Sequence, residues 1–179
     1  INYNKGSNLN YYFIKNNLMN RILKQYLQLE NFEKLIIIFG ILGVIPFMIG
    51  LIDLWYNYPN LMLIINIPKN YGVIIFTFLG ALYWGIVIHS KKRDPFSKKI
   101  NILTIMWSIT PPILGIIILA INHSLSLIIL IIGFVISQII DEIYNGILFF
   151  PKWYIILRRV LSSIVVTILI CSFLIITKI

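Results

Sequence analysis

The chain has 179 residues, of which 59% are hydrophobic, and it carries 15 Lys and Arg residues against 6 Asp and Glu, a formal net charge of +9. Long, nearly uncharged apolar runs exclude an ordinary soluble domain and indicate a membrane protein. The single cysteine, Cys171, excludes an intrachain disulfide and a metal site built from paired cysteines.

The N-terminal part of the chain precedes the apolar runs. Residues 1–17 are polar and rich in Asn and aromatic residues, without a clear period, and we expect an irregular tail. Residues 18–34 repeat apolar residues at helical spacing, with Arg21 and Lys24 on the opposite face. This pattern predicts an amphipathic helix that lies among the lipid head groups. A helix that packs on a partner subunit explains the pattern equally well.

Five apolar segments follow, each long enough to cross a hydrocarbon core about 30 Å thick at about 1.5 Å rise per residue. They cover residues 35–54, 71–89, 100–121, 124–140 and 155–176. The apolar stretch 61–67 is too short to cross and is bounded by Pro59 and Pro68, so we expect it at the membrane interface. The sequence therefore predicts an all-α membrane protein, with five transmembrane helices within residues 35–176 preceded by an amphipathic interfacial helix.

The basic residues fall on alternate connections between these segments. All but two of the 15 Lys and Arg residues lie on the side of the N-terminus, and the other side holds only Lys69 and Lys178. Short loops rich in Lys and Arg resist translocation, so the N-terminus should face the cytoplasm, or the matrix of a mitochondrion. Because five spans are an odd number, the C-terminus should face the opposite side. This distribution accounts for the net charge, and we expect no nucleic-acid partner.

Small or polar residues recur four apart on three of the spans, which places each set on one helix face. In lipid, small residues allow two helix backbones to approach closely, so we expect these stripes to pack helices together. A polar path lined by hydroxyl groups is the functional alternative. The stripes are Thr77, Ala81 and Gly85; Gly133, Ser137 and Asp141; and Ser163, Thr167 and Cys171.

Two adjacent prolines, Pro111 and Pro112, lie near the middle of the third span. Each removes a helix hydrogen bond, so the sequence predicts a kink there. Carbonyl groups exposed at such a break can bind ions or substrates, as in transporters with broken helices. The sequence shows no internal repeat that would supply a second broken helix.

Ionisable residues lie near the predicted ends of the spans, where they can remain hydrated. Asp141 or Glu142, at the end of the fourth span, could pair with Arg158 at the start of the fifth, and we predict an interhelical ion pair of Asp141 and Arg158. The connection between the second and third spans could hold the head group of an acidic lipid such as cardiolipin. Its basic residues are Lys91, Lys92, Arg93, Lys98 and Lys99. We expect no other cofactor.

Motifs of enzymes and metal sites are absent from the sequence. It contains no Gly-rich phosphate loop, no GxSxG and no HExxH motif. His89 and His123 should lie on opposite membrane faces, so they cannot share a metal. We assign no catalytic or metal-binding residue and expect no enzymatic activity.

Short motifs in the spans resemble those of the transmembrane protein 69 family, which occurs in mitochondria and bacteria. They lie in the same order over about residues 35–176 and are LGVIPF at residues 42–47, FLGxxxWG at residues 78–85 and PxWYxxLR at residues 151–158. The chain departs from the family at Ala81, where glycine is typical, and at Glu142, where a basic residue is common. The resemblance implies the mitochondrial inner membrane, with the N-terminus in the matrix and the C-terminus in the intermembrane space, and no established activity.

These features together favour a non-catalytic accessory or assembly subunit of an oxidative-phosphorylation complex, either a respiratory complex or the ATP synthase. Its expected partners are membrane lipid and other subunits of that complex. The alternative is a stand-alone small transporter or channel that uses a third helix broken at its prolines. A lipid-binding scaffold is compatible with either function.

Overall fold

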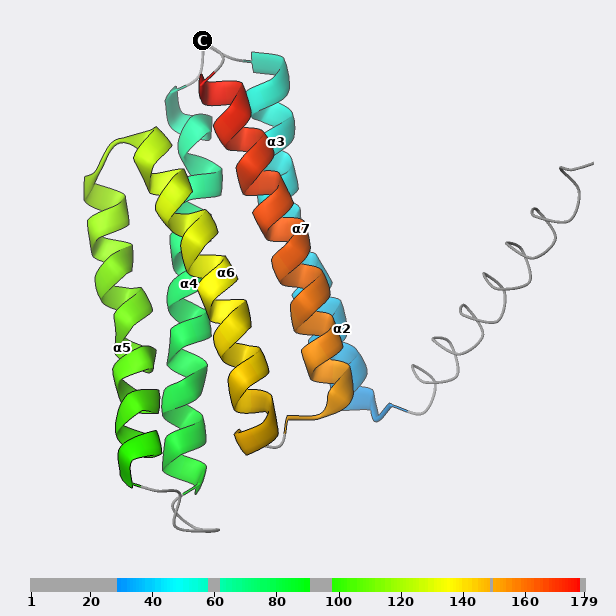
Figure 1. Cartoon of the computed structure of the whole chain (residues 1–179). Helices are drawn as coiled ribbons and strands as arrows, with labels where there is room; N and C mark the ends of the chain where they lie inside the picture. The colour runs from blue at the N-terminus through cyan, green and yellow to red at the C-terminus, as the bar shows by residue number, and fades with distance from the viewer. Residues whose placement is uncertain (1–28, 58–61, 91–97, 149, 178–179) are drawn as a thin grey trace, which may run out of the picture. The chain divides into compact units, whose positions relative to one another are not determined.

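The computed structural model describes residues 29–57, 62–90, 98–148 and 150–177, which form helices and, within these ranges, no strand (Figure 1). The chain divides into two units, Ile1–Gly40 and Ile41–Ile179. The predicted tail and the predicted amphipathic helix up to residue 28 lie outside the described residues. In the first unit, helix α2 begins at Asn31, earlier than the predicted start of the first span.

Five regions of helix are long and apolar enough to cross a membrane, which confirms the predicted all-α, multi-pass fold. These candidate spans are Asn31–Tyr56, Asn66–Ile88, Ile102–Ala120, His123–Tyr144 and Lys152–Thr177. The helices are α2 (Asn31–Leu42), α3 (Ile45–Asn57), α4 (Met62–Ser90), α5 (Lys98–Ala120), α6 (His123–Leu148) and α7 (Lys152–Thr177).

The first candidate span is interrupted at Gly43 and Val44, between α2 and α3. Pro46 has no N–H, so it cannot bond the carbonyl of Leu42 as a continuous helix would require. The hydroxyl of Tyr71, on α4, donates a hydrogen bond of 3.0 Å to the carbonyl of Gly43. Backbone polar groups in the hydrocarbon region need a partner within the protein, and Tyr71 supplies one at the interruption.

Helix α4 begins at Met62 and continues through Pro68. Residues 62–67 are therefore part of α4 rather than a separate segment, and their expected location at the membrane interface stays a prediction. Pro68 is fully buried against α3, where a Cβ added to Gly50 would lie 2.8 Å from two atoms of the proline ring. Glycine at position 50 allows this close contact. The packing stabilises the helix although Pro68 removes one of its hydrogen bonds.

Helix α5 also continues through its two prolines, so it is not broken there as the transporter alternative requires. The kink predicted at these prolines stays a prediction. Pro111 is fully buried against α4, where a Cβ added to Gly80 would lie 2.8 Å from the proline Cγ and 3.0 Å from the carbonyl oxygen of Ser108. Pro112 cannot donate a hydrogen bond to that carbonyl. The backbone of α4 at Gly80 covers it, so the carbonyl is not exposed for an ion.

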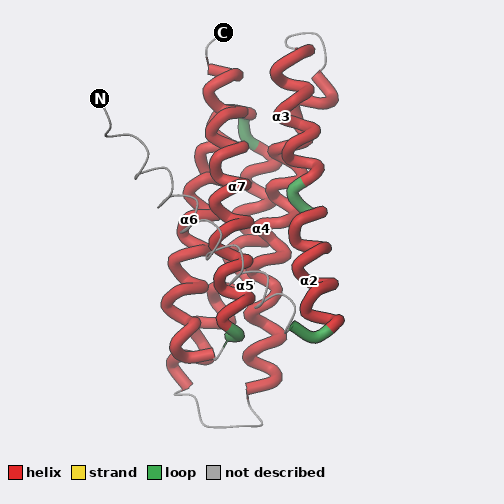
Figure 2. Tube along the Cα trace, turned by 90° about the vertical axis from the view of Figure 1, so that its right-hand side faces the viewer, coloured by secondary structure: helices red, strands yellow, loops and turns green. Residues whose placement is uncertain are grey.

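In the second unit, α4 contacts α3, α5 and α6, and α7 contacts α6 and α3. Helices α3, α4, α6 and α7 thus form a ring around an apolar core, and α5 packs mainly against α4. Figure 2 shows these helices running side by side along their lengths. Phe47, Phe76 and Phe134 meet in this core with their rings edge-on or tilted, and Gly133 makes room for the ring of Phe76.

Candidate functional site

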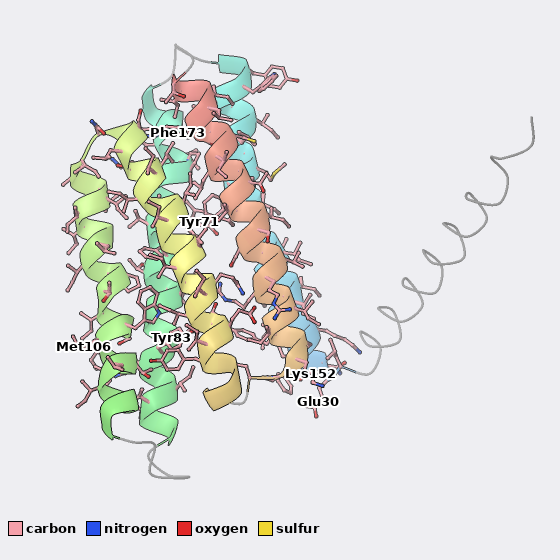
Figure 3. The ribbon with its side chains drawn as sticks, in the orientation of Figure 1. Glu30, Tyr71, Tyr83, Met106, Lys152 and Phe173 are labelled. Carbon is pink, nitrogen blue, oxygen red and sulfur yellow. The ribbon has the colours of Figure 1, made fainter. Side chains whose placement is uncertain are left out.

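Four polar side chains from three helices form a buried group, which we call the polar cluster: Tyr83 on α4, Ser137 and Asp141 on α6, and Arg158 on α7. Arg158 donates to Oδ2 of Asp141 from Nε at 2.9 Å and from Nη2 at 2.5 Å. The hydroxyl of Tyr83 donates to Oδ1 of Asp141 at 2.5 Å. Arg158 Nη2 also lies 3.5 Å from Oγ of Ser137. Figure 3 labels Tyr83 in the same half of the second unit as Lys152, at the start of α7.

Local sequence explains how these side chains meet. Ser137 and Asp141 are four residues apart, so they share a face of α6. The connection between α6 and α7 is only three residues long, from 149 to 151, and the two helices pack along each other. Arg158, in the second turn of α7, therefore lies level with Asp141. The structure brings together the two residues for which the sequence predicts an ion pair.

The ion pair is buried rather than hydrated. Asp141 is 4% exposed, Arg158 8% and Tyr83 2%. Asp141 lies within one turn of Tyr144, the end of its candidate span, as expected, but α6 itself continues to Leu148. The predicted fourth span ended at residue 140, where the hydrophobic run ends. A helix can continue beyond its hydrophobic run when its polar residues find partners within the protein.

The arrangement of the polar cluster determines its chemistry. Removing two ions from water costs several kcal/mol per ion, which the contact offsets only when the geometry is good and the remaining atoms are hydrogen-bonded. Here both oxygens of Asp141 accept hydrogen bonds, one set from Arg158 and one from Tyr83. Through these hydrogen bonds, the carboxylate links α4, α6 and α7.

A second ion pair lies beside the first, closer to the surface. Arg159 donates to Oε1 and Oε2 of Glu142 at 2.5 and 2.6 Å, and Gln138 Nε2 donates to Oε1 at 3.0 Å. From the sequence, either Asp141 or Glu142 could be the partner of Arg158. In the structure both acidic residues form ion pairs: Asp141 pairs with Arg158, and Glu142 pairs with Arg159. Two consecutive ion pairs therefore join α6 to α7.

The predicted packing stripes divide into an inner and an outer set. Among the inner residues, Gly133 adjoins Phe76, and Thr77 lies against Gly115 of α5, where an added Cβ would be 2.9 Å from the threonine methyl group. Ser137 is buried in the polar cluster. Four residues that were expected to pack helices of this chain are instead exposed, and for them the prediction is wrong. They are Ala81, Gly85, Ser163 and Thr167.

The outer position of these residues follows from helix geometry. Four residues turn an α-helix by slightly more than one full turn, so a stripe with a strict period of four drifts around the axis. On α4 the glycines that face neighbouring helices are Gly72, against Leu130, and Gly80, against Pro111. These glycines were not predicted to pack helices, because they do not share the four-residue spacing that begins at Thr77.

Sequence reasoning also missed a buried lysine. Lys69 on α4 is buried, and its ammonium group donates to the carbonyls of Leu119 and Ile121 at 3.3 and 3.0 Å. These carbonyls belong to the C-terminal end of α5, where a cation is favourable. The sequence predicts that Lys69 and Lys178 alone among the basic residues lie on their side of the membrane, and this isolation of Lys69 was the available signal.

The predicted lipid-binding residues Lys91, Lys92 and Arg93 lie outside the described residues. Lys98 and Lys99 begin α5. Within the described part of the chain, no three His, Cys, Asp or Glu side chains come together as a metal-binding group.

The comparison with protein families matches most of the chain. Residues 32–174 match a family of proteins of unknown function, DUF3429. No curated protein and no solved structure matches the chain. The matched region includes the interruption of the first span, both ion pairs and nearly all of the five candidate spans. The chain therefore belongs to the DUF3429 family.

Proposed function

We propose that this protein is a non-catalytic accessory or assembly subunit of an oxidative-phosphorylation complex of the mitochondrial inner membrane, either a respiratory complex or the ATP synthase. The observation that carries the proposal is the outward position of small residues on two helices. Ala81 and Gly85 are exposed on α4, and Ser163 and Thr167 are exposed on α7.

Small residues on a lipid-facing surface offer little contact to lipid tails but allow another helix to approach closely. A Cβ added to Gly85 would meet no atom within 4 Å, so the surface there is open. The large exposed side chains of Phe78 and Trp84 stand on either side of Ala81 along α4. On α7, the hydroxyl of Thr167 is bonded to the carbonyl of Ser163 at 2.8 Å, so this small-residue surface presents no unpaired hydroxyl at Thr167. Both surfaces suit transmembrane helices of another subunit.

The polar cluster is consistent with a structural role. Both oxygens of its carboxylate accept hydrogen bonds, from Arg158 and from Tyr83, and these bonds hold three helices together. A rigid bundle with small-residue surfaces on two of its helices can support the assembly of neighbouring subunits. The proposed location, with the N-terminus in the matrix, rests on the resemblance to the transmembrane protein 69 family and on the alternation of basic connections.

The proposal is tested by native gel electrophoresis of the source membranes in mild detergent, with mass spectrometry of each gel slice. We expect the protein to migrate with one large oxidative-phosphorylation complex. Gly85→Leu should release it from that complex without lowering its melting temperature, because a Cβ at this position meets no atom of its own chain within 4 Å. Ile116→Leu, at an exposed position of α5, is the matched control and should stay bound. A wild-type protein that migrates alone, near monomer or dimer mass, would contradict the proposal.

A stand-alone transporter or channel is a second candidate, and the interruption of the first candidate span favours it. Broken helices near the middle of a membrane line the substrate sites of many transporters. Single cysteines at Val44 and at Leu114, in a Cys171→Ser background, distinguish the two functions. Labelling of Val44→Cys by a water-soluble thiol reagent would support a water-filled path at the interruption. If both positions remain unlabelled, the subunit proposal is favoured.

A further inference from the structure

We propose that a water molecule is bound between α6 and α7, where Ser162 of α7, Ser137 of α6 and the guanidinium group of Arg158 hold it. Ser162 is 6% exposed, and its hydroxyl oxygen has no hydrogen-bond partner among the residues that the structure describes. A buried hydroxyl group without a partner is costly, so such groups in native proteins usually bind another protein atom or an ordered water molecule.

Other hydroxyl groups of α7 form a hydrogen bond within their own helix that Ser162 lacks. Thr167, Ser172 and Thr177 each donate to the carbonyl four residues earlier, at distances of 2.8, 2.9 and 3.0 Å. This local bond is the usual way to satisfy a hydroxyl group inside a transmembrane helix. The hydroxyl of Ser162 makes no such bond to the carbonyl of Arg158. It therefore remains available to a partner outside its own helix.

The position of Ser162 places it next to the polar cluster. It follows Arg158 by four residues on α7, and Ser137 precedes Asp141 by four residues on α6, so each serine lies one turn from the ion pair. Because α6 and α7 run in opposite directions and are joined by Asp141 and Arg158, the two serines lie at the same level of the interface. Ser137 is 1% exposed, so this level is closed to the surrounding membrane.

Some polar atoms of α6 and α7 at this level have long hydrogen bonds or no hydrogen-bond partner among the described residues. Arg158 Nη2 lies 3.5 Å from Ser137 Oγ, longer than the usual N–H···O distance of about 2.7–3.2 Å. Gln138 Oε1, in the same turn of α6, is a further buried atom without a partner among the described residues. A buried water molecule needs two to four polar partners, and Ser162, Ser137 and Arg158 supply three.

The ligand is water rather than an ion because its surroundings carry no net charge. Asp141 and Arg158 have opposite charges and are in direct contact, so the pair offers no net charge to a cation or an anion. The two serine side chains contribute neutral hydroxyl groups, which can both donate a hydrogen bond to water and accept one from it. This inference does not depend on the proposed function, since a packed subunit and a transporter can both contain a structural water molecule.

Two alanine variants of α7, compared by melting temperature in detergent, test the proposal. Ser162→Ala should lower the melting temperature by about 2–4 °C, because the bound water loses a partner. Ser172→Ala is the matched control, since Ser172 is also fully buried but is bonded to its own helix at Ile168, and we expect it to have a smaller effect. If the interface is dry, Ser162→Ala removes an unpaired hydroxyl group, and an unchanged or higher melting temperature would overturn the proposal.

Radiolytic hydroxyl-radical labelling provides a second, direct measurement on the folded protein in lipid nanodiscs. A bound water molecule generates radicals inside the bundle, so the buried residue Val165, one turn from Ser162, should be oxidised in the wild type. This oxidation should be lost in Ser162→Ala and retained in Ser172→Ala. Absence of oxidation at Val165 in the wild-type protein would count against a bound water at this site.

Discussion

Asp141 bears a charge that its apolar surroundings would not tolerate without Arg158 and Tyr83. The sequence indicated the ion pair because Asp141 and Arg158 flank one short connection, and helices joined in this way usually pack against each other. It did not indicate Tyr83, which lies 58 positions before Asp141 and resembles the other tyrosines of the chain. A hydrogen bond between distant segments depends on the packing of whole helices, which local spacing does not reveal.

The buried pair should show strong coupling in a double-mutant cycle. Asp141→Asn and Arg158→Gln each leave a buried charge without its partner, and each should lower the free energy of unfolding by about 3–5 kcal/mol. The double variant should lose less than the sum of the two losses. Reversible unfolding in mixed micelles of increasing SDS content measures the free energy of unfolding of each variant. The exposed pair of Glu142 and Arg159 is the control, and its cycle should be nearly additive. Additive losses at Asp141 and Arg158 would show that their contact contributes no coupling.

The hydroxyl group of Tyr83 should contribute separately to stability. Tyr83→Phe keeps the ring, which packs edge-on against Tyr144 at a centroid distance of 5.5 Å, but leaves Asp141 Oδ1 without its donor. We expect the free energy of unfolding to fall by about 1–3 kcal/mol, measured in the same micelles. Tyr56→Phe, at a tyrosine that is 78% exposed, is the control and should have little effect. Equal stabilities of Tyr83→Phe and the wild type would exclude a stabilising role for this hydrogen bond.

At the scale of the helices, apolar length predicted which segments form spans but not where helices are interrupted. Pro68 was expected to bound a short segment, and a break at Pro111 and Pro112 was part of the transporter alternative, but each proline lies inside a continuous helix. The interruption occurs at Gly43 and Val44, just before Pro46. The outcome depends on the neighbouring helix. Glycines at positions 50 and 80 accept proline rings and compensate for a lost hydrogen bond by close packing, and sequence spacing within one helix does not show which glycine lies opposite.

The contact between Gly80 and Pro111 should therefore be sensitive to a single methyl group. Gly80→Ala would place Cβ 2.8 Å from the ring of Pro111 and 3.0 Å from a backbone oxygen, neither of which can move easily. We expect a loss of about 1–3 kcal/mol in the free energy of unfolding, as for other overpacked positions. Gly85→Ala lies five residues later on the same helix and meets no atom, so it should be neutral or slightly stabilising. If Gly80→Ala is as stable as Gly85→Ala, the two helices do not pack as closely as the structure shows.

At the scale of the whole molecule, the strongest sequence signal is the alternation of basic connections, and it makes a prediction about topology. The exposed residue Asn122 lies between α5 and α6, and the exposed residue Lys152 begins α7. These positions are at opposite ends of α6, which is long enough to cross the membrane. The positive-inside rule assigns Lys152 to the side of the N-terminus and Asn122 to the other side.

Single cysteines at these two positions, in a Cys171→Ser background, allow the topology to be measured in sealed membrane vesicles with an impermeant thiol reagent. In vesicles that expose the side of the N-terminus, we expect Lys152→Cys to be labelled and Asn122→Cys to be protected until detergent is added. In vesicles of the opposite orientation, the pattern should be inverted. Labelling of both positions from one side would mean that α6 does not span the membrane. Labelling of Asn122→Cys alone in the first vesicles would mean that Asn122, and not Lys152, shares the side of the N-terminus, which would contradict the assignment from the positive-inside rule.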